Sequence, residues 1–194
     1  TLETPYLQGA LDYLKKRDIA FKIHAGGEAE GNASNIFKAD DHVLTAKYSV
    51  YGGIENFKNL WLWLLQRFCA LELEYNQPQQ MLWNGIYHPN ADKVYTSLEE
   101  YQEKFCNPNY PTIGLIFYRN EWLLDNLAYQ KALVEECFKQ KVNIIAVFSH
   151  GVKNPEMGAP GLEEAVNKYF IKDGKTIIDA LINTIKFSLT ASAS

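Results

Sequence analysis

The chain has 194 residues, of which 47% are hydrophobic and 22% charged, and its formal net charge is −4. This mixture is typical of a soluble globular protein with one ordinary domain or two small ones, and the acidic balance argues against a nucleic-acid partner. The most apolar run, residues 60–65, is far too short to span a bilayer, so we expect no membrane segment.

The first half of the chain predicts a loose α/β arrangement. The predicted elements are a helix at 5–17, a strand at 19–25, a long apolar helix at 51–73 and a helix at 97–105. Ser97 and Glu100 have the spacing of a capping box at the start of the last helix. Residues 39–48 and 81–95 show no clear pattern.

The second half is more regular. A break rich in Pro and Asn, residues 106–111, precedes apolar runs at 112–118, 142–149 and 176–183, with helical patterns at 123–141 and 161–170. The apolar runs begin about 30 residues apart, the length of a βαβ unit, so we predict three neighbouring parallel strands covered by helices. We therefore expect an α/β fold with an N-terminal segment, residues 1–105, and a flavodoxin-like βαβαβ subdomain, residues 106–194.

Polar residues follow each predicted strand. Arg119 and Asn120 follow the first, His150 the second, and Asn183 and Thr184 the third. Ligands of open parallel sheets bind at the carboxyl ends of the strands, so these residues predict a binding site at one edge of the sheet. Two alternatives stay open for the Arg119 guanidinium, which either pairs with an acidic group of a ligand or forms a local salt bridge.

Candidate metal ligands are sparse. His88, in a His-Pro turn, either lines a pocket or ligates a metal as neutral imidazole, or it has a structural role, and the structural role is favoured. His150 presents the same choice. The consecutive residues Asp40, Asp41 and His42 favour a solvated turn over a metal site. Cysteines at positions 69, 106 and 137 form no CxxC pair and are expected to be reduced, buried or half-buried thiols of a cytoplasmic protein. We predict neither a catalytic group nor a metal site in this chain.

Four segments, in order, resemble the large subunit of cobaltochelatase, CobN. They are "YGGIENFKNLWLWL" (51–64), "GIYHPNADKVYTSLEEY" (85–101), the stretch from "PTIGLIFYRNEW" to "FSHGVK" (111–153), and "IDALINTIKFSL" (178–189). The H subunit of magnesium chelatase shares this scaffold. The Phe117-Tyr118-Arg119 run with Trp122 favours the cobalt type.

The resemblance implies a multisubunit ligase of cobalamin (or chlorophyll) biosynthesis, in which the large subunit holds a tetrapyrrole and Co²⁺ (or Mg²⁺) and separate AAA+ subunits hydrolyse ATP. The chain has no GxxxxGK[ST] phosphate loop, in keeping with nucleotide binding elsewhere. On this resemblance we expect a fragment that binds no cofactor and is inactive alone.

The resemblance also implies which residues contact the tetrapyrrole. They are Tyr118, Arg119, Asn120, Trp122, His88 and His150. The alternative function is a non-catalytic small-molecule-binding module, one lobe of a two-lobed receptor, because such lobes also place polar loops at strand ends.

Overall fold

The computed structural model describes residues 5–19, 21–23, 33–34, 36–155 and 157–185. Contacts between Cα atoms divide the chain into two compact units: unit 1 is Thr1–Tyr51 with Glu55–Gln79, and unit 2 is Gly52–Ile54 with Gln80–Ser194. The division therefore falls near residue 80, and not at the Pro-rich break at 106–111. The physical reason is that Ile86, Leu98 and Tyr101 share a hydrophobic core with the strands that follow the break.

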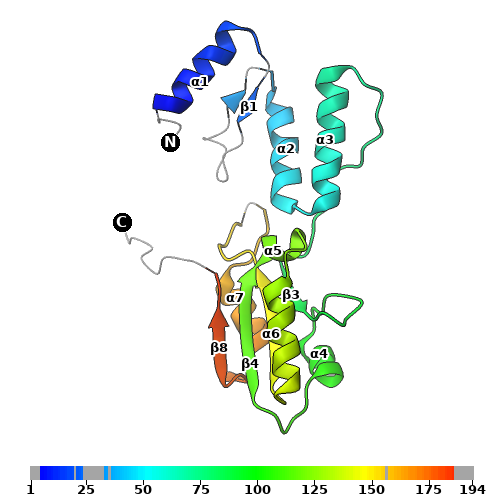
Figure 1. Ribbon diagram of the computed structural model, residues 1–194, viewed down its shortest axis with the longest axis vertical. Helices are drawn as coiled ribbons and strands as arrows, with labels where there is room; N and C mark the ends of the chain where they lie inside the picture. The colour runs from blue at the N-terminus through cyan, green and yellow to red at the C-terminus, as the bar shows by residue number, and fades with distance from the viewer. Residues whose placement is uncertain (1–4, 20, 24–32, 35, 156, 186–194) are drawn as a thin grey trace. The chain divides into compact units, whose positions relative to one another are not determined.

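Unit 1 is mainly helical. It contains α1 (Pro5–Lys16), a short antiparallel pair of β1 (Lys22–Ile23) and β2 (Ala33–Ser34), α2 (Ala39–Tyr51) and α3 (Ile54–Cys69). The helix predicted at 5–17 is confirmed (Figure 1). The strand predicted at 19–25 is reduced to β1, and residues 20, 24 and 25 lie outside the described residues. Residues 39–48, which showed no clear pattern, form most of α2.

Helix α3 holds an extended segment by side-chain amides. The segment, residues 70–82, has no regular secondary structure. Asn56 pairs with the backbone of Gln79 in both directions: its Oδ1 accepts the N–H at 2.9 Å and its Nδ2 donates to the carbonyl at 2.7 Å. Asn59 Oδ1 accepts the N–H of Asn76 at 2.7 Å, and the Tyr48 hydroxyl donates to the Asn76 carbonyl. These two asparagines are poor helix formers, but their side chains supply hydrogen bonds to the backbone that a neighbouring strand would otherwise make.

Unit 2 is built on a four-stranded sheet of order β3-β5-β4-β8. The strands are β3 (Asn84–Tyr87), β4 (Thr112–Tyr118), β5 (Asn143–Ser149) and β8 (Ala180–Asn183). β4 pairs in parallel with both β5 and β8, which confirms the predicted arrangement of three neighbouring parallel strands. β3, which the sequence did not predict, pairs with β5 in the antiparallel sense. The third predicted strand, 176–183, is shorter than expected, because β6 (Ile171–Lys172) and β7 (Lys175–Thr176) form a separate hairpin.

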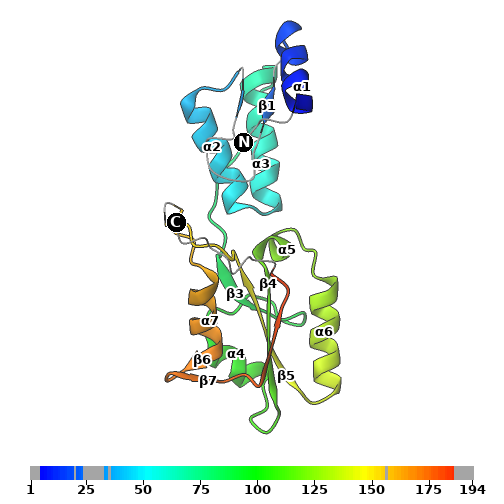
Figure 2. The ribbon, with the colours of Figure 1, turned by 90° about the vertical axis from the view of Figure 1, so that its left-hand side faces the viewer.

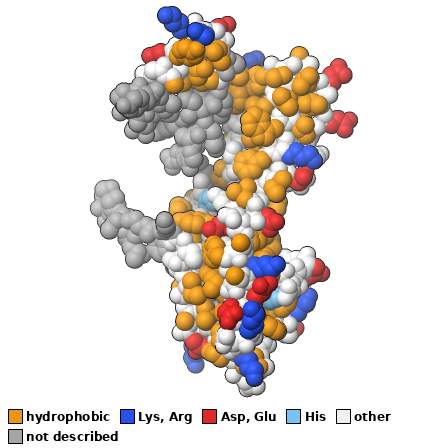
Figure 3. Space-filling view, in the orientation of Figure 1, with side chains coloured by type: hydrophobic (Ala, Val, Ile, Leu, Met, Phe, Trp, Pro, Cys, Tyr) orange, Lys and Arg blue, Asp and Glu red, His pale blue; other side chains and the backbone are white. Residues whose placement is uncertain are grey.

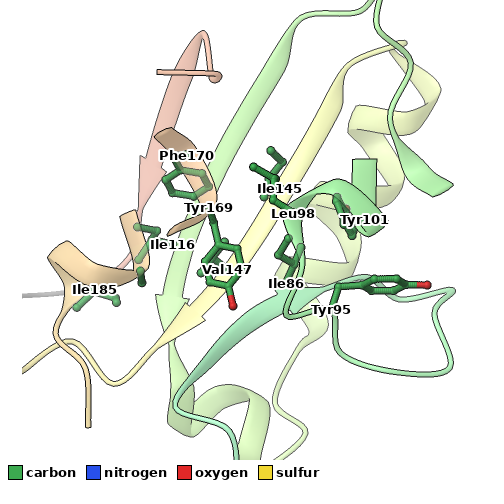
Figure 4. Close-up of a cluster of buried hydrophobic side chains, with 11 residues drawn as sticks. Ile86, Tyr95, Leu98, Tyr101, Ile116, Ile145, Val147, Tyr169, Phe170 and Ile185 are labelled. Atoms are coloured by element: carbon green, nitrogen blue, oxygen red, sulfur yellow. The ribbon is translucent and has the colours of Figure 1, made fainter. Parts of the chain in front are cut away.

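Helices cover both faces of the sheet (Figures 1 and 2). α5 (Arg119–Leu123) and α6 (Ala128–Lys139) lie on one face, while α4 (Leu98–Phe105) and α7 (Leu162–Phe170) lie on the other. Side chains alternate along a strand, so each strand feeds two cores. The core on the α4 and α7 face is drawn in Figure 4. It contains Ile116, Ile145 and Val147, and the core on the α6 face contains Phe117 and Phe148.

Several local features meet the expectations only in part. Ser97 Oγ accepts the N–H of Glu100 at 3.2 Å, as a helix cap should, but the Glu100 carboxylate pairs with Lys93 and does not close the capping box. The three cysteines are free, and Cys69 is exposed, contrary to the expectation of buried thiols. Within the described residues, the helices lack the combination of length and apolar content needed to cross a membrane.

Candidate binding site at the carboxyl edge of the sheet

The carboxyl end of β4 is the natural place for a ligand in this topology. The chain passes from β4 to its neighbour β5, and then crosses back to β8 on the other side of β4. Open sheets of this kind bind ligands outside the carboxyl ends of the strands, where the direction of winding changes. β3 runs antiparallel to the others, so its first residues, and not its last, reach the same edge.

The strand register brings the side chains of Trp83, His150 and Arg119 together at this edge. Asn84, Ser149 and Tyr118 are paired across β3, β5 and β4. The next residues outward are Trp83, His150 and Arg119, and their side chains are in contact. The Arg119 guanidinium carbon lies 4.3 Å from the centre of the Trp83 ring, and the His150 ring meets the Trp83 ring edge-on at 5.4 Å.

Arg119 is buried, with an exposed fraction of 1%. Its Nε donates to the carbonyl of Leu82 at 2.6 Å and its Nη2 to the carbonyl of Met81 at 3.2 Å. Burial disfavours the charged form and lowers the pKa of the guanidinium to about 10, so it stays protonated at neutral pH. The Arg119 side chain therefore fixes the segment that leads into β3.

His150 is only partly exposed, and its pKa is lowered, first by burial and second by the nearby charge of Arg119. The imidazole is therefore neutral at neutral pH. Gly151 follows with a φ of 89°, a conformation that suits glycine and turns the chain immediately after the histidine. The buried Ser149 hydroxyl accepts the N–H of Gly151 at 3.3 Å and so stabilises this turn.

The remaining residues predicted after β4 are arranged around α5. Asn120 is exposed, and Tyr118 is partly buried against the core on the α4 and α7 face of the sheet. Trp122 stacks on Phe148, with ring centres 4.2 Å apart and an interplanar angle of 5°. The structure thus places Tyr118, Arg119, Asn120, Trp122 and His150 at one edge, although their role in binding stays a prediction.

A polar group that the sequence did not predict links α5, α6 and Thr184, the residue that follows β8. The Tyr129 hydroxyl lies 2.9 Å from both Glu121 Oε2 and Thr184 Oγ1, and Gln130 Nε2 donates to the same Glu121 oxygen at 2.7 Å. Burial raises the pKa of Tyr129 to about 12, so the phenol stays protonated. This group fixes the Glu121 carboxylate next to the carboxyl end of β4. Sequence gave no signal for Tyr129, because a tyrosine on a helix is usually a packing residue.

His88 does not join this site. It follows β3, whose antiparallel direction carries its last residues away from the carboxyl ends of β4 and β5. The His88 ring is 7% exposed and stacks on Phe105 at 3.8 Å, and its Nδ1 accepts the N–H of Asn90 at 3.2 Å. Burial, and to a lesser extent Lys104, lowers its pKa. These contacts support the structural role. A shallow hollow of about 220 Å³ beside it is lined by His88, Pro89, Val134, Glu135 and Phe138, among others.

Possible metal ligands do not gather elsewhere in the part of the chain that the structure describes. Within the described residues, no group of three or more His, Cys, Asp and Glu side chains is close enough to hold a metal ion. Asp41 instead accepts the N–H of Lys38 at 2.9 Å and pairs with Arg67 at 3.4 Å. Asp41 therefore has a structural role in the first turn of α2.

Comparisons with known proteins place this arrangement in context. The profile of the family described as CobN/Magnesium Chelatase matches residues 46–194. An uncharacterized protein of Methanocaldococcus jannaschii is 40% identical over 157 residues, which cover 78% of this chain and 12% of that protein. The chloroplastic magnesium-chelatase subunit ChlH of Oryza sativa is 22% identical over 171 residues, again 78% of this chain and 12% of that protein.

A solved structure shows the same fold. The catalytic subunit of cobaltochelatase from Mycobacterium tuberculosis superposes with a TM-score of 0.52 at 17% sequence identity, covering 92% of this chain and 13% of that subunit. The chain thus spans about an eighth of the length of the proteins that it matches.

Proposed function

Because this chain belongs to the CobN/magnesium chelatase family, we propose that it forms part of the large, tetrapyrrole-binding subunit of a metal chelatase. The observation that carries the proposal is the match of the family profile to residues 46–194, which include the whole sheet and its carboxyl edge. The match favours this function over the lobe of a small-molecule receptor. The complete enzyme inserts Co²⁺ into a corrin, or Mg²⁺ into a porphyrin, with ATP hydrolysed by separate AAA+ subunits.

The chemistry of the carboxyl edge suits such a ligand. A tetrapyrrole is a flat, largely apolar ring that carries carboxylate or amide groups at its periphery. Tyr118 and Trp122 are partly exposed aromatic side chains that pack on flat rings, and Asn120 is an exposed amide. Arg119 adds positive charge beneath them but is itself buried, so it acts on a ligand mainly through its field.

Fluorescence titration tests the binding of a tetrapyrrole. The natural polypeptide that contains this chain is titrated with a metal-free corrin and, separately, with a metal-free porphyrin. We expect saturable quenching of tryptophan fluorescence by one of them, and the preferred ring identifies the substrate class.

Two variants show where the ring binds. Asn120→Ala, at the exposed start of α5, should weaken binding, while Trp61→Phe in unit 1, where the indole is 65% exposed, should leave the affinity unchanged. Quenching that does not saturate with either ring would refute the proposal.

The metal-insertion step is tested separately. The chain contains no phosphate loop, and we predicted neither catalytic residues nor a metal site within it. We therefore expect the 194-residue chain, mixed with the partner ATPase subunits, ATP, Co²⁺ and a metal-free corrin, to leave the absorbance spectrum of the corrin unchanged. A shift to the spectrum of the metallated ring would show that these residues suffice for catalysis.

A further inference from the structure

The imidazole of His150 has an unusual position for a structural histidine. Its ring contacts Trp83, and the charge of Arg119 is close enough to influence it. Within the described residues, neither of its ring nitrogens has a hydrogen-bond partner. The residue is also partly exposed, so its ring is not sealed inside the core.

His88 provides the contrast within the same unit. Its Nδ1 is occupied by the N–H of Asn90, its ring is stacked on Phe105, and only 7% of it is exposed. A histidine that packs and caps a turn has this appearance. His150 lacks these contacts, so packing alone does not account for an imidazole at the carboxyl edge.

The environment of His150 keeps its lone pair available. Burial and the positive charge of Arg119 both disfavour the imidazolium, as the lowered pKa shows. Neutral imidazole is the form that binds metal ions. Protonation therefore does not compete with coordination at neutral pH.

A second, independent observation marks the same edge as incomplete. Trp83 is only 9% exposed, and among the residues that the structure describes its buried Nε1–H has no hydrogen-bond partner. An unsatisfied buried donor typically costs about 1–3 kcal/mol, so structures rarely retain one without a reason. Trp83 contacts both His150 and Arg119, so the unpaired donor and the unpaired imidazole belong to one cluster.

We propose that His150 is an axial ligand of the metal ion held in the tetrapyrrole, with Trp83 and Arg119 positioning its ring. The proposal rests on the proposed function, because the macrocycle supplies four of the metal's nitrogen ligands and the protein needs to supply only one. A single histidine is therefore sufficient, and a larger cluster of metal ligands is not required. The step is coordination alone: a ring-nitrogen lone pair binds the metal and displaces a water molecule, with no change of oxidation state.

The test uses electron paramagnetic resonance. A Co²⁺ porphyrin that carries peripheral carboxylates is bound, without oxygen, to the natural polypeptide that contains this chain. One axial nitrogen on low-spin Co²⁺ splits the cobalt lines into triplets, because ¹⁴N has a nuclear spin of 1. We expect triplets with the unmodified protein, their loss in His150→Ala, and their return when free imidazole is added to that variant.

His88→Gln is the matched control and should keep the triplets, because its ring is committed to packing. Saturable quenching of tryptophan fluorescence by the porphyrin in His150→Ala shows that this variant remains folded around the ligand. Triplets that persist in His150→Ala, or that are lost equally in His88→Gln, would overturn the assignment. The assignment also fails if the variant loses metal insertion but the unmodified protein never shows triplets, since His150 would then act as a base.

The same samples separate this inference from the proposed function. Quenching of tryptophan fluorescence by the porphyrin without triplets in the unmodified protein means that the ring binds but His150 is not its ligand. In that case the proposed function stands and the axial role is wrong. Absence of saturable quenching by either a porphyrin or a corrin overturns both.

Discussion

Unit 2 and unit 1 use apolar residues in opposite ways. In unit 2 the sheet buries them on both faces, so that Ile145, Val147 and Phe148 are fully buried. In unit 1, α3 buries Asn56 and Asn59 and leaves Trp61 65% exposed. Figure 3 shows hydrophobic side chains gathered on the surface over α2 and α3.

The difference shows which kind of interaction determines the structure of each unit. Burial of apolar area determines the sheet, because each strand contributes to two cores. Directed hydrogen bonds determine the path of residues 70–82, because an extended segment without a neighbouring strand must satisfy its backbone by other means. Unit 2 should therefore respond mainly to lost volume, and unit 1 mainly to lost hydrogen bonds.

The largest expected effect comes from Ile145→Ala, which removes a fully buried side chain from the core on the α4 and α7 face of the sheet. We expect the free energy of unfolding of unit 2 to fall by about 2–5 kcal/mol, from lost burial and the resulting cavity. Leu65→Ala, on a residue of α3 that is 38% exposed, should change stability by less than about 0.5 kcal/mol. Denaturant titration with hydrogen exchange followed in each unit measures both. Equal losses of unfolding free energy in the two variants would contradict the difference between unit 2 and unit 1.

Arg119→Ala tests whether a hydrogen-bonding residue also stabilises unit 2. It leaves the carbonyls of Met81 and Leu82 without the guanidinium donor. We expect a loss of about 2–4 kcal/mol in all, since a hydrogen bond from a charged donor contributes about 1.5–3 kcal/mol and water partly replaces it at these part-buried carbonyls. Arg119→Lys keeps the charge but not the planar fork, so its loss should be smaller. An unchanged melting temperature would mean that water replaces the guanidinium at little cost.

Asn56→Ala addresses the extended segment of unit 1. It removes both hydrogen bonds to Gln79, and we expect a loss of about 1–3 kcal/mol with faster hydrogen exchange at the Gln79 amide. Asn56→Asp retains an acceptor for the Gln79 N–H but cannot donate to the carbonyl. Its free energy of unfolding should therefore lie between those of the unmodified protein and Asn56→Ala. If alanine and aspartate behave alike, the donated bond is the important one.

The smallest effect is expected at the start of α4. Ser97→Ala removes the oxygen that accepts the N–H of Glu100, at a typical cost of about 1 kcal/mol. Ser97→Asp should retain most of the stability, because a carboxylate accepts the same bond and favours a helix N-terminus. Urea unfolding curves of the two variants, compared side by side, check the order.

Sequence predicted the centre of the fold better than its margins. β4 and β5 were found because buried strands leave a continuous apolar pattern: all seven residues of β5 are buried, and four consecutive residues of β4 are. β3 was missed because it is short, lies at an edge and contains Gly85, where a Cβ would come within 2.3 Å of Val94. Its antiparallel direction could not be deduced from periodicity.

That one strand also explains what was right and wrong about the site. Arg119 and His150 were expected at one edge because they follow parallel strands, and the structure brings them together. For His88 the structural role was favoured over pocket lining, and the antiparallel direction of β3 carries it away from this edge. The same reversal brings Trp83 to the edge. Burial of Arg119 was not predictable, because its partners are backbone carbonyls of a segment with no sequence pattern.

The thiols offer a practical consequence of the two-unit architecture. Cys69, at the end of α3, is exposed, while Cys106 and Cys137 in unit 2 are partly buried. Burial raises the pKa of Cys106 to about 11 and also raises that of Cys137, which keeps both in the unreactive thiol form. A maleimide dye at neutral pH should therefore label unit 1 selectively. The native chain thus carries its own attachment point for a fluorophore on unit 1.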